Sequence, residues 1–322
     1  MWTDSVVSFS LRCIQGLSWA WNSLRLKTFS MAFSPRLCPN SECTFHCKTG
    51  GTFYKKSFYR IKRLNQHIRR FQCKHCRKTF SSRTFKADYC HKKMDLNFQL
   101  AELLIKGNSL RDCARLLKMT YKNTYRKFQW LIEQARVAKY NIPWKAEVLQ
   151  FDEMETIHHT KCKPLSIALM VNEKYEILAA QVAEMPAKGR LAEISRIKYG
   201  PRFDAREIVL ENCFKTAKKS LCETPETIMS DARPTYRKFV EQYFAESSYE
   251  IHSRADKERH RSRLHEKLQK KRFDPMFAIN QRCAKLRSSI RRLARRSWCT
   301  TKKVENLQGH LDLFIVMQFG LL

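Results

Sequence analysis

Two pairs of cysteines near the beginning of the 322-residue sequence have the spacing of metal ligands. Cys38 and Cys43 form the first pair, and Cys73 and Cys76 form the second. Each pair can place two thiolates on one turn, and two such turns can close a tetrahedral zinc site. A unit of this size cannot fold on apolar burial alone, so the metal would supply folding free energy. The pattern predicts a structural zinc site within a zinc ribbon at residues 36–86.

The cysteines also permit other interpretations. A Cys-x-x-Cys pair can be a redox pair, but the second cysteine pair and the absence of a surrounding βαβ pattern disfavour that reading. The remaining cysteines are mostly scattered through periodic segments, which is typical of small buried residues in a reducing cytoplasm rather than of disulfides. The spare ligand candidates, which we interpret as bystanders, are His46, Cys47, His67 and His75.

Two aspartates belong to apolar segments that have the pattern of buried strands. Asp152 lies near the end of the strand expected at 148–156, and Asp231 ends the strand expected at 226–231. Carboxylates at the ends of separate strands can meet at one edge of a sheet, where they repel unless a cation lies between them. Hard oxygen ligands favour Mg²⁺ or Mn²⁺, and two such ions about 4 Å apart can promote phosphodiester cleavage. Asp231 can also cap the helix expected from Pro234, and the two roles are compatible.

The segment that carries both aspartates, residues 146–252, alternates short apolar runs with helical periods, which is an α/β pattern. The expected order of elements is strand, strand, strand, helix, strand, helix and strand. A turn at 172–174 separates the second strand from the third. Beyond the two strands that carry the aspartates, we expect strands at 165–171, 175–183 and 249–252 and helices at 204–219 and 234–244.

Residues 87–140 have the periodicity of three helices. The first ends at Gly107, the second begins after Ser109, and the third begins after Thr120. Two short helices joined by a tight turn are typical of a helix-turn-helix, although an ordinary three-helix bundle has the same periodicity. In a helix-turn-helix the last helix would enter the major groove of DNA with its first residues. The candidates for base or phosphate contact are Tyr121, Lys122, Asn123, Tyr125 and Arg126.

The charge of the chain favours a polyanionic partner. Sixty-two Lys and Arg against thirty Asp and Glu give a formal net charge of +32, and nucleic acid is the commonest partner of so basic a protein. Basic residues surround the expected zinc ribbon, where they could contact phosphates, and a basic helical insert is expected at about 253–275. The basic helices could bind nucleic acid, although for some of their residues a solvated helical face is the simpler interpretation.

The two ends of the chain differ from the rest. Residues 1–35 are interpreted as an extension that need not be native, with Met31 as a candidate start and an amphipathic helix as the alternative. An apolar C-terminal helix is expected at 301–322. Both segments are too short or too broken to span a bilayer, and the first lacks the cleavage site of a signal peptide. We therefore expect no membrane partner.

In this order, the motifs resemble those of the insertion-sequence transposases of the DDE superfamily, in the group with an N-terminal zinc ribbon and a helix-turn-helix. The resemblance covers about residues 36–318. Its marks are Cys38-Pro to Cys43, Cys73-x-x-Cys76-x-Lys-Thr-Phe80, Phe151-Asp-Glu-x-Glu-Thr156, Ser230-Asp231-x-x-x-x-Tyr236, and the stretch from Asn280 through Leu286-Arg287 to Arg296. It implies a multidomain α+β or α/β protein with a ribonuclease H-like catalytic domain at 146–300, in which helices flank a mixed sheet. Such a core uses two divalent metals to cleave and rejoin transposon ends.

The third catalytic position departs from the usual pattern of this family. Members place Glu, or in some branches Asn, on the helix after the last strand, and that position aligns with Asn280. An asparagine offers a carbonyl oxygen but no charge, so the second ion would bind less tightly than with Glu. Asp274 and Glu305 are the alternatives for this position. Arg287 is the candidate to hold the scissile phosphate, because its planar fork suits that contact.

The resemblance implies a DNA transposase that binds transposon end repeats and performs divalent-metal-dependent strand cleavage and transfer. It also implies a homo-oligomer on double-stranded transposon ends and target DNA, associated with the nucleoid in a bacterial cytoplasm. The alternative is a catalytically inactive, transposase-derived, sequence-specific DNA-binding protein, which Asn280 keeps open. An RNA-processing nuclease is a third interpretation, which the expected helix-turn-helix disfavours.

Overall fold

The structure is a computed structural model that describes residues 33–46, 48–62, 65–252, 274–294 and 298–320. The chain divides into two compact units, residues 1–97 and 98–322. Cys47, residues 1–32 of the expected extension and most of the expected basic insert lie outside the described residues. Among the described residues, no helix is both long and apolar enough to cross a membrane.

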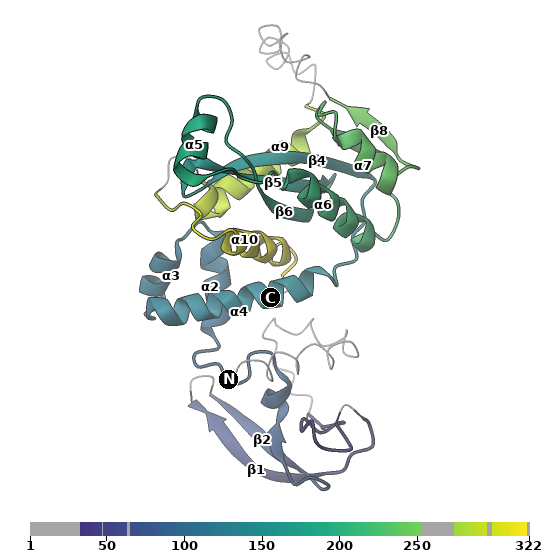
Figure 1. Cartoon of the computed structure of the whole chain (residues 1–322). Coiled ribbons are helices and arrows are strands. Elements are labelled where there is room, and N and C mark those ends of the chain that lie inside the picture. The colour runs from purple at the N-terminus through teal and green to yellow at the C-terminus, as the bar shows by residue number, and fades with distance from the viewer. Residues whose placement is uncertain (1–32, 47, 63–64, 253–273, 295–297, 321–322) are drawn as a thin grey trace, which may run out of the picture. The chain divides into compact units, whose positions relative to one another are not determined.

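The first unit contains a three-stranded antiparallel sheet in the order β1-β2-β3, seen at the bottom of Figure 1. Its elements are β1 (Phe53–Ile61), β2 (Gln66–Cys73), β3 (Thr79–Ser81) and the short 3-10 helix η4 (Ser82–Phe85). Its buried core is small and consists of Phe71, Phe80 and three cysteines, packed against partly buried Phe53 and Phe45. So few apolar side chains cannot offset the conformational entropy of the chain, which indicates a need for an added cross-link such as a metal.

The helical segment forms α2 (Leu96–Ile105), α3 (Leu110–Leu116) and α4 (Tyr121–Lys139). The expected caps are present. The Ser109 hydroxyl accepts a hydrogen bond from the Asp112 amide at 3.2 Å, and the Thr120 hydroxyl accepts one from the Asn123 amide at 3.4 Å. Gly107 follows α2 with φ +83°, a conformation that a glycine adopts without strain.

The sheet of the second unit has five strands in the order β6-β5-β4-β7-β8. They are β4 (Val148–His158), β5 (Thr160–Asn172), β6 (Ile177–Glu184), β7 (Thr227–Ser230) and β8 (Ser248–Ile251). β5 pairs antiparallel with β4 and with β6, whereas β7 pairs parallel with β4 and with β8. The predicted mixed sheet flanked by helices is therefore confirmed, with β4 and β5 longer than expected.

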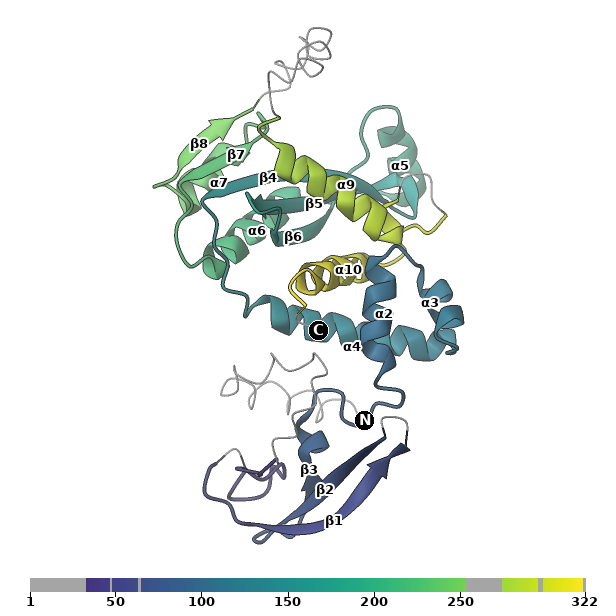
Figure 2. The ribbon, with the colours of Figure 1, turned by 180° about the vertical axis from the view of Figure 1, so that it is seen from behind.

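Helices cover both faces of this sheet (Figures 1 and 2). They include α5 (Leu191–Tyr199), α6 (Arg206–Ser220), α7 (Tyr236–Tyr243) and α9 (Phe277–Ser289). On one face, the Phe151 ring of β4 packs against Phe214 of α6 and Tyr236 of α7, with centroids 5.0 and 4.8 Å apart. The preceding residue, Gln150, points to the other face and contacts α9. Because strand side chains alternate, Asp152 shares the α9 face with Gln150.

Helix α5 is absent from the sequence-based order of elements. Its apolar residues explain the omission, because Ile194 and Ile197 are 52% and 78% exposed and form no buried stripe. A short helix without such a stripe leaves little periodic signal in the sequence.

Helix α10 (Val304–Met317) packs between α4 and the edge strand β6. The Gln308 side chain completes the edge of the sheet, because its Nε2 donates to the Ala180 carbonyl at 2.9 Å and its Oε1 accepts from the Val182 amide at 3.0 Å. Backbone groups that an edge strand would leave unpaired are thereby satisfied. The expected apolar C-terminal helix is thus part of the packed core.

The other side of α10 lies against α4. Asp312, only 1% exposed, forms an ion pair with Lys139 at 2.5 Å and a second one with Arg136 at 3.6 Å. The His310 ring lies 4.5 Å from that of Phe128. The sequence analysis divided this part of the chain into separate units at 87–140, 146–300 and 301–322. In the structure, their described residues from 98 onward form one compact unit.

The closest approach of α10 to α4 gives a stability prediction. A Cβ at Gly309 would lie 2.2 Å from Cδ1 and 2.5 Å from Cγ1 of Ile132. We expect Gly309→Ala to lower the free energy of unfolding by about 1–3 kcal/mol, because one added methyl overpacks the contact. Denaturant unfolding of the full chain measures this change. In an Ile132→Ala background the same substitution should cost far less, and an equal cost in both backgrounds would contradict the overpacking explanation.

Candidate zinc site and candidate active site

Four cysteine side chains meet at one point in the first unit. The Sγ atoms of Cys38, Cys43, Cys73 and Cys76 all lie within 4.8 Å of one another. The Cys38–Cys76 and Cys43–Cys73 sulfur distances are 3.5 and 3.9 Å. Thiolates about 2.3 Å from a tetrahedral Zn²⁺ lie roughly 3.8 Å apart, so the cluster has the dimensions of a structural zinc site. The predicted ligand set is brought together.

Two turns hold the cysteines in place. In the first, the Cys38 amide donates to the Phe45 carbonyl at 3.0 Å, which closes the loop that carries Cys43. In the second, the Arg77 amide donates to the Cys73 carbonyl at 3.0 Å, and Arg77 adopts φ +58°. Each turn thereby brings its pair of cysteines into the cluster, as the pairwise spacing predicted.

The electrostatics of the cluster suit a cation. Burial raises the pKa of the Cys38 thiol to about 12. Burial acts in the same direction on Cys76, but hydrogen bonds from the Lys78 backbone and the Asn40 side chain outweigh it and lower the pKa of that thiol to about 7. Thiols with such different pKa values all become thiolates when they bind one metal ion, because the metal replaces their protons.

The spare ligand candidates do not join the cluster. His46 Nδ1 lies 3.1 Å from the Cys38 carbonyl oxygen, and His67 is exposed on β2. The His75 ring packs edge-on against Phe45 at 5.6 Å. Among the described residues, the four cysteines are the one group of three or more His, Cys, Asp or Glu side chains close enough to hold a metal.

Replacing one ligand should remove the metal. We expect purified Cys76→Ser to contain less than one equivalent of zinc and to lose the cooperative unfolding of the first unit, because three thiolates hold Zn²⁺ less tightly. Elemental analysis and thermal unfolding of the full chain measure both effects. Cys90→Ser is the matched control, since Cys90 is an exposed cysteine of the same unit outside the cluster. Full zinc content in Cys76→Ser would contradict the ligand assignment.

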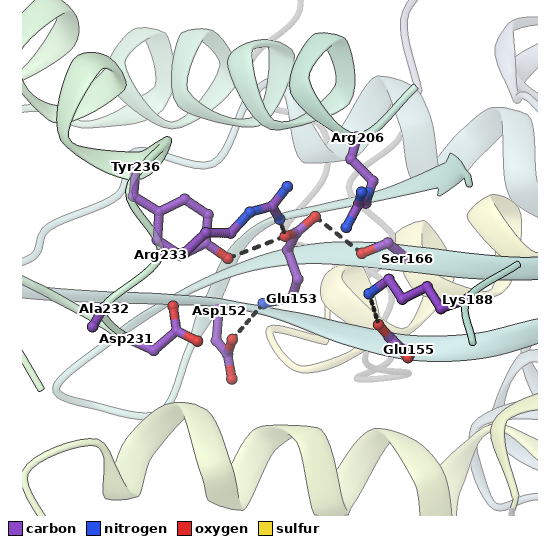
Figure 3. A pocket seen from close by; sticks show the side chains of 10 residues that line it. All are labelled: Asp152, Glu153, Glu155, Ser166, Lys188, Arg206, Asp231, Ala232, Arg233 and Tyr236. Atoms are coloured by element: carbon purple, nitrogen blue, oxygen red, sulfur yellow. Dashed lines mark hydrogen bonds and ion pairs between the residues drawn. The ribbon is translucent and has the colours of Figure 1, made fainter. Parts of the chain in front are cut away.

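In the second unit, the register between β4 and β7 places two aspartates side by side. Phe151 pairs with Ser230 in the parallel ladder, so the next residues, Asp152 and Asp231, occupy equivalent positions where that pairing stops. Figure 3 shows their side chains next to each other. The sequence placed Asp152 near the end of its strand, but β4 continues to His158 because β5 pairs with it beyond this point. The two aspartates therefore lie side by side where β7 ends, while β4 continues past them.

The Asp231 carboxylate has an unsatisfied atom. Its Oδ1 is buried and has no hydrogen-bond partner among the described residues. Oδ1 of Asp152 accepts a hydrogen bond from the Glu153 amide at 2.7 Å. Burial raises the pKa of the Tyr236 hydroxyl, and the negative charges of Asp231 and Asp152 raise it further, which places both carboxylates near this phenol. A buried, unpaired carboxylate oxygen beside a second carboxylate is a site for a cation.

The two aspartates line a cavity of about 420 Å³. Its other lining residues are Glu153, Glu155, Ser166, Lys188, Arg206, Ala232, Arg233 and Tyr236. Lys188 forms an ion pair with Glu155 at 2.7 Å. The Arg206 guanidinium binds Asp204 at 2.6 Å and holds the pKa of that carboxyl below its usual value. The cavity thus has an acidic end at the aspartates and paired charges elsewhere.

Glu153 organises the face of β4 opposite Asp152. Its carboxylate forms an ion pair with Arg233 and accepts hydrogen bonds from the Ser166 hydroxyl at 3.0 Å and the Tyr236 hydroxyl at 3.2 Å. Its charge is therefore already compensated. Because Arg233 follows Asp231 by two residues, this network fixes the loop after β7 against β4. Glu153 and Tyr236 belong to the motifs quoted above, but the local sequence gives no sign of the contact between them, because they are 83 residues apart.

Gln150 fixes the helix that passes the aspartates. Its Oε1 accepts from the Ile279 amide at 3.0 Å, and its Nε2 donates to the Pro275 carbonyl at 2.8 Å, so both ends of the amide hold the beginning of α9. Burial raises the pKa of Cys283 on α9 to about 12, and the Asp152 charge acts in the same direction. Asp152 is therefore close to the middle of α9.

The predicted third position lies outside the cavity lining. Asn280 is exposed on α9, and its Nδ2 donates to Asp274 Oδ2 at 2.9 Å. Asp274 Oδ1 accepts from the Met276 amide at 3.1 Å, so Asp274 stabilises the turn that precedes this helix. Glu305 is exposed at the start of α10 and does not line the cavity. Arg287 lies on the same helix as Asn280, and its charge is felt at Cys283.

The candidate DNA-contacting residues lie on the first turns of α4. Tyr121, Lys122, Asn123 and Arg126 are exposed. Tyr125 is half-buried, and its ring is stacked 6.3 Å from that of Tyr121. Most of this set is accessible to a partner, while the rest of α4 packs on α10.

No known family model matches the chain, and none of the curated proteins matches it.

Proposed function

We propose that the chain is a DNA transposase that binds transposon end repeats and performs divalent-metal-dependent strand cleavage and transfer. The observation that carries the proposal is the pair formed by Asp152 and Asp231, with the buried Oδ1 of Asp231 unpaired among the described residues. A catalytic Mg²⁺ or Mn²⁺ held by these oxygens would activate the attacking hydroxyl and stabilise the leaving oxygen of a phosphodiester.

The surrounding residues support this chemistry by fixing the two carboxylates. The Glu153–Arg233 ion pair and the Tyr236 hydrogen bond hold the loop that presents Asp231. Gln150 of β4 holds the beginning of α9 on the sheet face that Asp152 shares. The carboxylates are thus fixed before substrate arrives, which reduces the reorganisation needed during the reaction. Three antiparallel strands followed by two parallel ones, with helices on both faces, support the ribonuclease H-like assignment.

Double-stranded DNA is the proposed substrate because of the helices before the sheet. The short helix α3 and the long helix α4 are joined by a capped turn. The first turns of α4 are exposed and basic, as in a helix that reads DNA. Helix α10 packs α4 against the sheet edge, so a duplex read by α4 would be held at a fixed position relative to the aspartates. The zinc cluster adds a second basic unit for contacts to phosphates.

We propose Asn280 as the third position and Arg287 as the phosphate contact, since both lie on α9, near Asp152. Asn280 is three residues before Cys283, which is one helical turn. To coordinate a metal, the Asn280 side chain would have to leave Asp274. The contact between Asn280 and Asp274 favours a second function. Because it holds Asn280 outside the cavity lining, the chain could be an inactive sequence-specific DNA-binding protein.

A cleavage assay tests the proposal. The full chain is incubated with DNA that carries the repeats flanking its own gene, with Mg²⁺, with Mn²⁺ or without a divalent ion. We expect metal-dependent nicks at the repeat ends, and at least a 100-fold slower reaction for Asp152→Ala and Asp231→Ala, since one lost electrostatic contact at a reacting centre costs about that much.

The mutants should bind the same DNA as tightly as the unmodified chain. Glu241→Gln, an exposed carboxylate of α7, is the matched control and should cut normally. Tight binding of the repeats without cleavage under either metal would contradict the enzyme and favour the inactive DNA-binding protein.

A further inference from the structure

We propose that one face of the three-stranded sheet binds an unpaired nucleic acid strand by stacking its bases on Tyr54 and Tyr59. We call this surface the tyrosine face. It consists of Tyr54, Tyr59, Ile68, Arg70 and Gln72. The inference goes beyond the proposed function, because it concerns a different unit and a different form of nucleic acid, and it does not depend on catalysis.

The register of the hairpin places both tyrosines on one face. Tyr54 pairs with Gln72 and Tyr59 pairs with Ile68, while an irregularity between Lys55 and Phe58 keeps the two rings on the same side. The partner positions are four residues apart on β2, so the rings are separated by about 13 Å along the strand.

The opposite face carries the core of the unit. Phe53, Phe71 and Phe80 lie there together with Cys73, and Phe85 of η4 packs on Phe80 at 5.6 Å. The η4 helix thus packs on the core face, whereas on the tyrosine face Tyr54 and Arg70 are exposed and Tyr59 is half-buried; Figure 2 shows the strands that carry these residues. Tyr54 is 54% exposed, which is unusual for a large ring whose burial would contribute to such a small core.

Each tyrosine ring has a cation over its face, which a stacking base would displace to the side. Lys74 Nζ lies 4.8 Å from the centre of the Tyr54 ring, and Arg70 Cζ lies 5.2 Å from the centre of the Tyr59 ring. Long basic side chains can move their charged ends while their stems stay in place. A base that stacks on a ring would thus arrive with its phosphate next to a cation already held there.

The charge of the unit restricts the partner to an anion. Between residues 43 and 87 the sequence contains thirteen Lys and Arg and no Asp or Glu. Charge alone would suit duplex DNA as well, but in a duplex the faces of the bases are stacked on one another and closed to protein rings. Accessible rings on a basic surface are the pattern of single-strand recognition, in which stacking tolerates any base, and here Tyr54 is exposed and Tyr59 half-buried.

Binding of labelled oligonucleotides to the full chain tests the inference. Fluorescence anisotropy at one fixed salt concentration, without Mg²⁺ or Mn²⁺, gives dissociation constants for oligothymidine, oligouridine and a random-sequence duplex. We expect Tyr54→Leu/Tyr59→Leu to weaken single-strand binding by about fivefold or more per ring, and duplex binding by less than twofold. Tighter binding of oligothymidine than of oligouridine, or the reverse, identifies DNA or RNA as the strand, and either supports stacking.

Two controls separate stacking from other effects. Tyr54→Phe/Tyr59→Phe keeps both rings and should bind like the unmodified chain, and Tyr89→Leu removes an exposed ring of the same unit outside the face. Zinc content reports whether each variant is folded. If the double leucine variant loses zinc, Tyr54→Leu alone decides, because it leaves the 3.1 Å hydrogen bond between the Tyr59 and Ser81 hydroxyls intact. Unchanged single-strand binding, or equal loss for single strands and duplex, overturns the proposal.

Discussion

The parallel pairing between β4 and β7 is the contact on which the candidate active site depends. It aligns Phe151 with Ser230, so that Asp152 and Asp231 follow at equivalent positions where β7 ends. Two carboxylates this close repel each other, and one oxygen of Asp231 is buried without a partner among the described residues. A protein maintains such an arrangement against its electrostatic cost when a cation compensates it. Contacts from the loop after β7 and from α9 hold the strands that carry this pair.

The support comes from three directions. Glu153 and Arg233 join β4 to the loop after β7 on one face of the sheet. Gln150 attaches α9 on the other face, and Gln308 of α10 satisfies the open edge of β6. Because α10 also packs on α4, the helices that could read DNA and the sheet that could cut it form one compact unit. The first unit is a separate compact unit and contains the cysteine cluster.

Features set by neighbouring residues could be predicted from the sequence, whereas those set by distant contacts could not. Ser109 and Thr120 cap helices within three residues, and the cysteine pairs each lie on one turn, so local chemistry sufficed. Helix α5 has exposed apolar residues and gave no periodic signal. The Glu153 network joins residues about 80 positions apart, as in the 83-residue separation of its contact with Tyr236. The position of Asn280 depends on how Gln150 anchors α9, which no local pattern encodes.

The most direct test is to titrate the full, zinc-loaded chain with Mn²⁺. The electron paramagnetic resonance signal of free Mn²⁺ then reports how much of the ion is bound. The account predicts that the unmodified chain binds Mn²⁺ and that Asp231→Asn, which keeps the side-chain shape but removes the charge, binds it at least tenfold less tightly. Glu246→Gln, which alters an exposed carboxylate outside the cavity, should bind as the unmodified chain does. Equal Mn²⁺ affinity in Asp231→Asn and the unmodified chain, at equal zinc content, would contradict the claim that the paired aspartates form a cation site.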